Sequence, residues 1–255
     1  MRKAFLIVTC ACGIGLAADA PYAGKWKMNP AKSNFGESTV TFEQMPGGQI
    51  KMTMDGQSYT FKLDAKDTMT PWGTTNAWKA VDTKTWETTE KINGKVMSTS
   101  MTKLSGDGKT LTIDSKRVKP DGGTSNDSMT LDRVSGGPGL AGKWKTKKLT
   151  SSSPESLSLT PRGNDGLTIS IGDGGGVCDA KFDGKDYPAT GTLWPAGWTC
   201  AVAKKGSNAI DLTWKREGKE MYKSTLTAAA DGKSLTETGS AAGINEKFTV
   251  VYERQ

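Results

Sequence analysis

Apolar and polar residues alternate along most of this chain, in short runs that end at Gly, Asp or Asn. Runs of this kind occupy 39–42, 50–54, 59–63 and 167–171. A period of two residues is typical of half-buried β-strands. Dipeptides such as Asp55-Gly56 and Asn93-Gly94, which separate the runs, favour tight hairpins. No segment has the apolar spacing of a long amphipathic helix, so the pattern predicts an all-β chain.

A set of short motifs occurs twice along the chain in the same order. The tetrapeptide Gly-Lys-Trp-Lys stands at 24–27 and again at 142–145, and the hairpin segment 107–112 is matched by 231–236. Repetition of this kind indicates two copies of one structural unit. We therefore predict a first domain at 21–134, a flexible Gly-rich linker at 135–141 and a second domain at 142–255.

Each copy contains eight or nine expected strands, most of them joined by tight turns. A meander of that many strands exposes two unpaired edges unless it closes on itself, and closure makes a barrel. The prediction is two tandem antiparallel up-and-down β-barrels. A β-sandwich is the alternative, because the same alternation of apolar and polar residues fits both folds.

Two aromatic residues and two arginines occupy special positions in this pattern. Trp26 and Trp144 alternate with flanking lysines on the first strand of each copy, which places both indoles on the inward face. Arg133 and Arg254 share the apolar face of the closing strands. An Arg on an apolar face is costly unless its charge finds partners, and stacking on an indole meets that need.

These residues resemble a signature of the calycin superfamily, the lipocalins and fatty-acid-binding proteins. The resembling residues are Gly24 and Trp26 with Arg133, and Gly142 and Trp144 with Arg254. In that family an Arg or Lys of the last strand packs across a Trp of the first strand at the closed end of the barrel. The resemblance implies lipocalin-like barrels. The connection after the first strand is too short for the two-helix lid of fatty-acid-binding proteins.

The first twenty residues have the composition of a secretory signal. Arg2 and Lys3 precede an apolar run at 4–16, and small residues follow it. We predict a signal peptide at 1–20 and a bacterial exported protein, periplasmic or secreted. No later segment is apolar enough to be a transmembrane helix. Cys178 and Cys200 remain after the signal, and in an exported protein such a pair predicts a disulfide bond.

The composition argues against several classes of function. The chain has no His, which removes His-based catalytic triads and the usual His-containing zinc sites. Its formal net charge of +7 is spread over both copies and makes no basic stripe for nucleic acid. The carboxylates Asp64 and Asp67 lack the spacing of a calcium loop. We expect neither an enzyme, nor a metal site, nor a cofactor.

Binding of a small apolar or amphipathic molecule in a barrel is the function we expect. Trp72 and Trp194 lie in matching Pro/Gly-flanked segments, with Trp78 close behind the first, and they could contact a ligand at a barrel mouth or simply cover that end. Inward-facing Glu90 and Arg117 could pair with each other or orient a polar ligand head. In the second copy Trp214 stands in the place of Glu90, so the first barrel is expected to hold the better cavity.

Two other functions fit the same sequence. One is a structural or interaction module of the cell envelope that uses its outer faces. The other is a glycan-binding protein that uses exposed Trp and acidic side chains.

Overall fold

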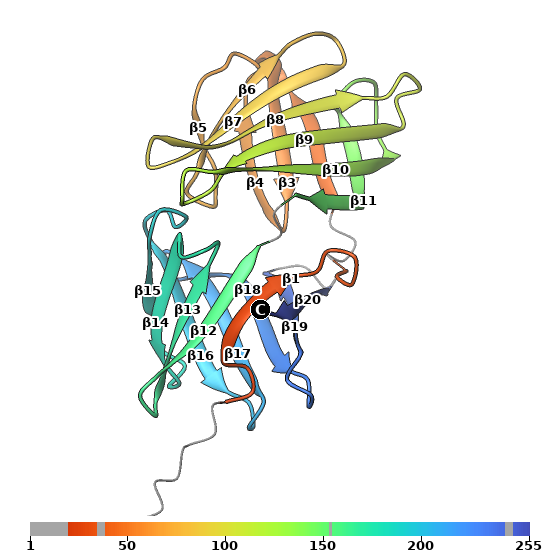
Figure 1. Cartoon of the computed structure of the whole chain (residues 1–255). Helices are drawn as coiled ribbons and strands as arrows, with labels where there is room; N and C mark the ends of the chain where they lie inside the picture. Colours follow the sequence, from red (N-terminus) through yellow and green to blue (C-terminus); the bar gives the residue numbers. More distant parts are fainter. Residues whose placement is uncertain (1–19, 35–38, 153–154, 243–246) are drawn as a thin grey trace, which may run out of the picture.

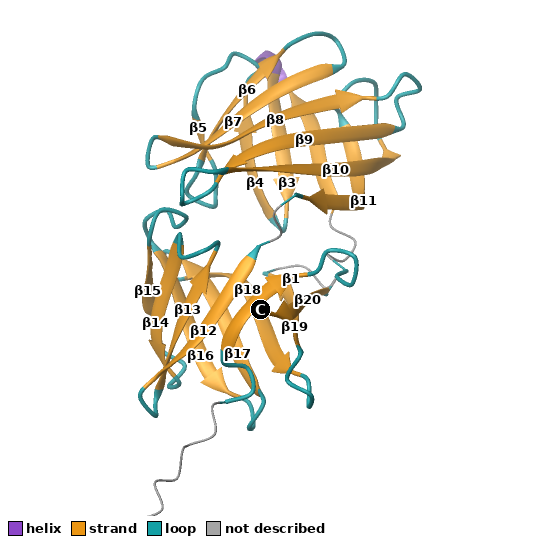
Figure 2. Cartoon of the chain, in the orientation of Figure 1, coloured by secondary structure: helices purple, strands orange, loops and turns teal. Residues whose placement is uncertain are grey.

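The computed structural model of the chain describes residues 20–34, 39–152, 155–242 and 247–255, so the predicted signal at 1–20 lies almost wholly outside the described residues. The described part consists of antiparallel strands and one 3-10 turn, Pro46–Gly48 (Figure 2). The strands form two barrels, one closed and one nearly closed, which lie end to end (Figure 1). The predicted all-β fold with two antiparallel barrels is therefore confirmed. No helix in these residues is long and apolar enough to cross a membrane.

The nearly closed barrel, called the open barrel below, is a ten-stranded sheet. Its strands follow one another in the order β4 (Gln57–Phe61), β3 (Gln49–Met54), β2 (Thr39–Met45), β11 (Gly142–Ser151), β10 (Thr124–Ser135), β9 (Thr110–Val118), β8 (Lys95–Leu104), β7 (Thr85–Ile92), β6 (Thr75–Ala80) and β5 (Thr68–Met69). Side chains and one bridge hold its edges together. An isolated antiparallel β-bridge joins the backbones of Asp64 and Lys79 of β6. The hydroxyl of Tyr59 on β4 accepts a hydrogen bond from Trp78 Nε1 at 3.1 Å.

The second barrel, called the closed barrel below, has a continuous ring of strand pairs. Its order is β1 (Gly24–Met28), β12 (Ser156–Arg162), β13 (Gly166–Ile171), β14 (Gly176–Lys181), β15 (Tyr187–Thr190), β16 (Trp198–Lys204), β17 (Ala209–Arg216), β18 (Lys219–Ala228), β19 (Ser234–Ala241) and β20 (Phe248–Arg254). β1 pairs with both β12 and β20 and so closes the ring.

The first strand of each sequence repeat lies in the barrel of the other repeat. β1 belongs to the closed barrel, and β11 pairs with β10 and β2 in the open barrel. Figure 1 shows the red β1 among the strands of the lower barrel. The predicted boundaries 21–134 and 142–255 therefore do not match the strand placement. The open barrel comprises 39–151, and the closed barrel combines 24–28 with 156–254.

The segment 135–141 is a hairpin loop within the open barrel, and the prediction of a linker there is wrong. The loop wraps around the guanidinium of Arg133, which donates to the carbonyls of Gly137, Gly139 and Ala141 at 2.6 to 2.7 Å. Gly142 closes the loop at φ +141°, where a Cβ would collide with the carbonyl of Ser135 and with the Arg133 side chain. Glycine supplies this conformation without strain. The loop thus makes β10 and β11 neighbours.

Each buried indole is covered by a guanidinium, but the partners differ from those expected. Arg133 lies 4.0 Å over the ring of Trp144, and Arg254 lies 4.1 Å over the ring of Trp26. The predicted pairs, Trp26 with Arg133 and Trp144 with Arg254, are therefore exchanged. The register explains this, because Arg133 stands directly opposite Trp144 and Trp26 directly opposite Arg254 on neighbouring strands.

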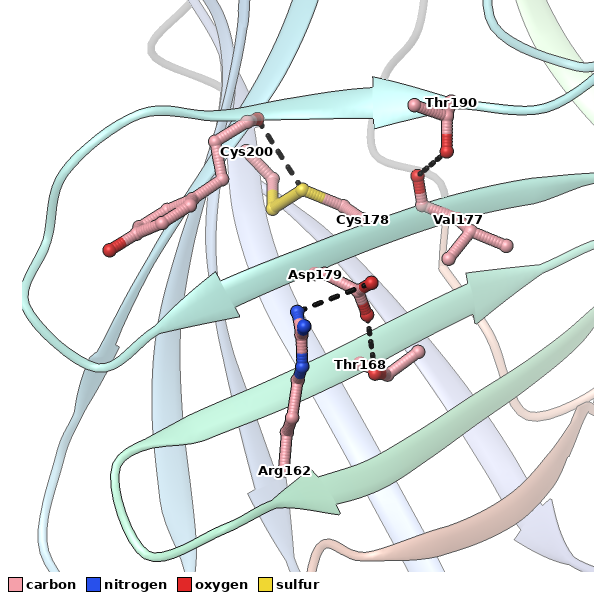
Figure 3. The surroundings of a disulfide bond; sticks show 8 residues. Arg162, Thr168, Val177, Cys178, Asp179, Thr190 and Cys200 are labelled. Atoms are coloured by element: carbon pink, nitrogen blue, oxygen red, sulfur yellow. Dashed lines mark hydrogen bonds and ion pairs between the residues drawn. A yellow bond between two sulfur atoms is a disulfide. The ribbon is translucent and has the colours of Figure 1, made fainter.

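The predicted disulfide is confirmed. Cys178 on β14 and Cys200 on β16 are bonded, and both lie buried in the core of the closed barrel. Figure 3 shows the bridge between the strands and, next to it on the outer face, Asp179 paired with Arg162 at 3.2 Å. Alternation along β14 therefore sends the sulfur inward and the carboxylate outward.

Candidate ligand cavity

The open barrel is packed at one end and hollow at the other. On β9 and β10 the inward positions at one end carry Leu111 and Leu131, which are almost fully buried beside Trp144. Farther along the same faces stand smaller or polar residues, Ser115 and Asp127. Because these side chains cannot fill the interior as Leu and Trp do, space remains.

This space is a cavity of about 760 Å³. Its apolar wall within the open barrel is formed by Met54, Ile92, Met97, Ile113, Met129 and Leu149, and its polar wall includes Ser98, Ser100, Ser115 and Ser151. The closed barrel and the connection that leads into it contribute Met28, Glu155, Ile171, Leu193 and Trp194. The cavity therefore lies at the end of the open barrel that faces the closed barrel.

Arg117 reaches this cavity but does not pair with Glu90, which was one of the two expected arrangements. Both residues stand opposite Ser98, so strand β8 separates them by about 10 Å between backbones. Arg117 Nε lies 3.4 Å from Asp127 Oδ2 and donates to Ser125 Oγ at 3.4 Å. Its partners therefore come from the neighbouring strand β10.

Glu90 interacts with a hydroxyl group at the cavity. It accepts a hydrogen bond from Ser98 Oγ at 3.2 Å. Among the described residues, no Lys or Arg nitrogen forms an ion pair with it. Its side chain lines the cavity together with Arg117 and Asp127.

Glu155 is a third carboxyl group at the cavity, and the sequence had not pointed to it. It stands just before β12, and its carbonyl accepts a hydrogen bond from the Met28 amide at 2.9 Å. Burial raises the pKa of Glu155, and the charges of Glu237 and Asp127 raise this pKa further, while Arg117 acts in the opposite direction. Among the described residues, the cavity is thus lined by three carboxyl groups and one guanidinium.

Asp127 and Glu155 differ in how visible they are in the sequence. Asp127 stands two residues before Met129 and so lies on the same inward face of the strand as Arg133. Extending the alternating pattern by one more position toward the start of this strand would have identified it. Glu155 gives no such signal, since only the stacking of the barrels brings it to the cavity.

The three tryptophans of the predicted site have different surroundings. Trp194 lines the cavity and stacks on Trp214 with ring centroids 4.5 Å apart. Trp78 is buried in the core of the open barrel, stacked on Phe61 at 4.6 Å. Trp72 packs against the cores of both barrels. Of the five predicted ligand contacts, the cavity brings together Glu90, Arg117 and Trp194.

The loop that carries Trp72 joins the two barrels. The Trp72 carbonyl accepts a hydrogen bond from Trp198 Nε1 at 2.9 Å, and the Pro71 carbonyl accepts one from Arg216 at 2.8 Å. Nearby, the Tyr222 hydroxyl donates to Asp55 at 3.4 Å, and burial together with the Asp55 charge raises the pKa of Tyr222 to about 12. These contacts hold the closed barrel where Trp194 can reach the cavity.

The described residues contain no cluster of three or more His, Cys, Asp or Glu side chains suited to a metal ion. No protein-family model matches the chain, and no curated protein matches its sequence. A crystal structure of a candidate outer membrane protein from Bacteroides fragilis aligns with 92% of this chain and 96% of its own, at 11% identity and a TM-score of 0.20. A similarity this low supports no conclusion about fold or function.

Proposed function

We propose that this protein is an exported, lipocalin-like carrier that binds a small apolar or amphipathic molecule in the cavity of the open barrel. The observation that carries the proposal is the cavity itself, about 760 Å³ in volume and lined by methionine, aliphatic and Trp side chains together with serines and four charged side chains. Ligand sites in proteins usually have this size and combine apolar walls with polar groups that orient the ligand. Unbranched Met side chains also adapt to ligands of different shape.

Other features agree with this proposal. Stacking of a guanidinium on a buried indole, which the calycin resemblance implies, occurs in both barrels, with the partners exchanged between the repeats: Arg133 lies over Trp144 and Arg254 over Trp26. A buried disulfide suits a protein that works outside the cytoplasm. Glycan binding would need exposed rings at Trp72 and Trp194, and both are half-buried between the barrels.

A pair of variants tests whether binding occurs in the cavity. Ser100 lines the cavity from β8, and its neighbour Thr99 is exposed on the outer face. We expect Ser100→Leu to weaken binding of amphipathic decyl compounds and environment-sensitive apolar dyes about tenfold or more by filling space. The matched control Thr99→Leu should bind as the wild type does. Binding is measured by calorimetry and by Trp fluorescence, and a panel without any bound compound would overturn the proposal.

A further inference from the structure

The charged groups around the cavity are mainly acidic. Glu90, Asp127 and Glu155 contribute carboxyl groups, and Arg117 contributes the one guanidinium among the described lining residues. The charged end of a ligand enclosed there would be held mostly by these groups. Inside a protein such charges act more strongly on one another than in water.

The guanidinium of Arg117 is already engaged by other groups of the protein. Arg117 Nε lies 3.4 Å from Asp127 and within hydrogen-bonding distance of Ser125 Oγ. Asp127 in turn accepts a hydrogen bond from Ser151 Oγ. A ligand carboxylate would have to compete with Asp127 for this guanidinium and would approach Glu90 and Glu155 as well.

Neither Glu90 nor Glu155 forms an ion pair with a Lys or Arg side chain among the described residues, and the charge of Arg117 reaches Glu155 only over a longer distance. Glu90 accepts one hydroxyl hydrogen bond, from Ser98. The carboxyl group of Glu155 forms no hydrogen bond or ion pair there, although it lines the cavity from the side of the closed barrel. Both residues are half-buried, and a partly desolvated carboxylate without an ion-pair partner is costly; a positively charged ligand group would remove that cost.

We infer that the cavity selects amphipathic organic cations, with an amine or a quaternary ammonium at the polar end near Glu90 and Glu155, and discriminates against fatty carboxylates. The apolar tail lies along Met54, Met97 and Met129 of the same cavity. This inference rests on the proposed carrier function and adds the chemical class of the ligand.

Three compounds with the same chain test the inference on the full-length protein. Decylamine, decanol and decanoate have the same number of carbon atoms and different head groups, and near neutral pH the first is cationic and the last anionic. We expect calorimetry below the micelle concentration to find decylamine bound about tenfold more tightly than decanol. Decanoate should bind more weakly than both.

Charge-neutral variants locate the effect. Glu90→Gln and Glu155→Gln should each reduce the preference for decylamine over decanol several-fold and leave decanol binding unchanged, which also shows that the variants are folded. The matched control is Glu87→Gln, since Glu87 lies on the same strand β7 but alternates with the buried Trp86 and Thr88 and so points outward.

The outcomes separate the two proposals. Equal binding of all three compounds, or tighter binding of decanoate, would overturn the cation preference and leave the carrier function standing. An unchanged preference in both Gln variants would overturn the assignment to these carboxylates. Failure of every compound to bind would remove the carrier function itself.

Discussion

Glu237 is a carboxyl group inside the closed barrel, and its surroundings favour the protonated form. It accepts hydrogen bonds from Ser224 Oγ at 2.7 Å and from the Tyr252 hydroxyl at 3.0 Å. Burial nevertheless outweighs these bonds and raises the pKa of Glu237 above its usual value. The folded protein therefore retains this proton at a pH where the unfolded chain has already released it.

The direction of the pH dependence follows from this difference. Where the folded state binds more protons than the unfolded state, stability falls as the pH rises. The stabilisation is complete below the unfolded-state pKa of Glu237 and is lost between that value and the raised folded-state pKa. We predict that Glu237→Gln removes this pH-dependent contribution to the unfolding free energy. The unfolding free energy of the variant relative to the wild type should rise as the pH increases above the ordinary glutamate pKa of about 4.3.

Urea unfolding at several pH values measures this difference. Glu253→Gln is a contrasting control, because hydrogen bonds from Lys32 and Asn29 lower the pKa of Glu253, and its contribution should have the opposite sign. A Glu237→Gln difference that did not change with pH would contradict the prediction.

At the scale of elements, the β10–β11 hairpin depends on one guanidinium. Arg133 covers the ring of Trp144 and donates to carbonyls of the loop and to the Gly108 carbonyl at 2.6 Å. We predict that Arg133→Met lowers the unfolding free energy by about 2–4 kcal/mol, since several carbonyls lose their donor. Arg133→Lys should recover only part of this loss, because an ammonium cannot reproduce the planar fork.

Chemical denaturation of the two variants measures the effect. The control is Val134→Thr on the next residue, which is 55% exposed and should change the unfolding free energy by less than about 0.5 kcal/mol. A full recovery in Arg133→Lys would show that charge alone, without the fork of hydrogen bonds, stabilises the hairpin.

At the scale of the whole molecule, the strand placement defines which segments can fold alone. The open barrel is continuous in sequence, from β2 to β11. The closed barrel is not, because β1 precedes the open barrel in the sequence and its other strands, β12 to β20, follow it. We predict that the fragment 39–151 folds by itself, with the near-ultraviolet circular dichroism and cooperative unfolding of a packed domain. The fragment 21–134, of almost the same length, lacks β11 and should remain largely unfolded.

The two fragments test two definitions of the first domain: 39–151 follows the observed strand order, and 21–134 follows the sequence repeat. A folded 21–134 together with an unfolded 39–151 would mean that each repeat closes on its own first strand. Removing 1–34 from the full chain gives a second measurement. It should destabilise the closed barrel and weaken ligand binding, because Met28 is removed and Glu155 and Trp194 lose their support at the cavity, while the open barrel itself stays folded.

Much of this molecule could be predicted from its sequence, for a local reason. Side chains on a strand alternate with a period of two, so composition along a short run decides which residues point inward. This argument yielded the strands, the buried Trp26 and Trp144 with an Arg on each closing strand, the inward cysteines, and the presence of Glu90 and Arg117 inside the first barrel. It also yielded the expectation that the first barrel holds the better cavity.

Only the tertiary structure decided which strands are neighbours. The two Gly-Lys-Trp-Lys strands carry the same inward and outward pattern, so alternation cannot assign either to a barrel. The tight loop around Arg133 makes that choice for β11, and β1 then completes the closed barrel. Strand order likewise paired Arg117 with Asp127 instead of Glu90. The end-to-end placement of the barrels brought Glu155 and Trp194 to the cavity, because contacts between distant segments leave no periodic trace in a sequence.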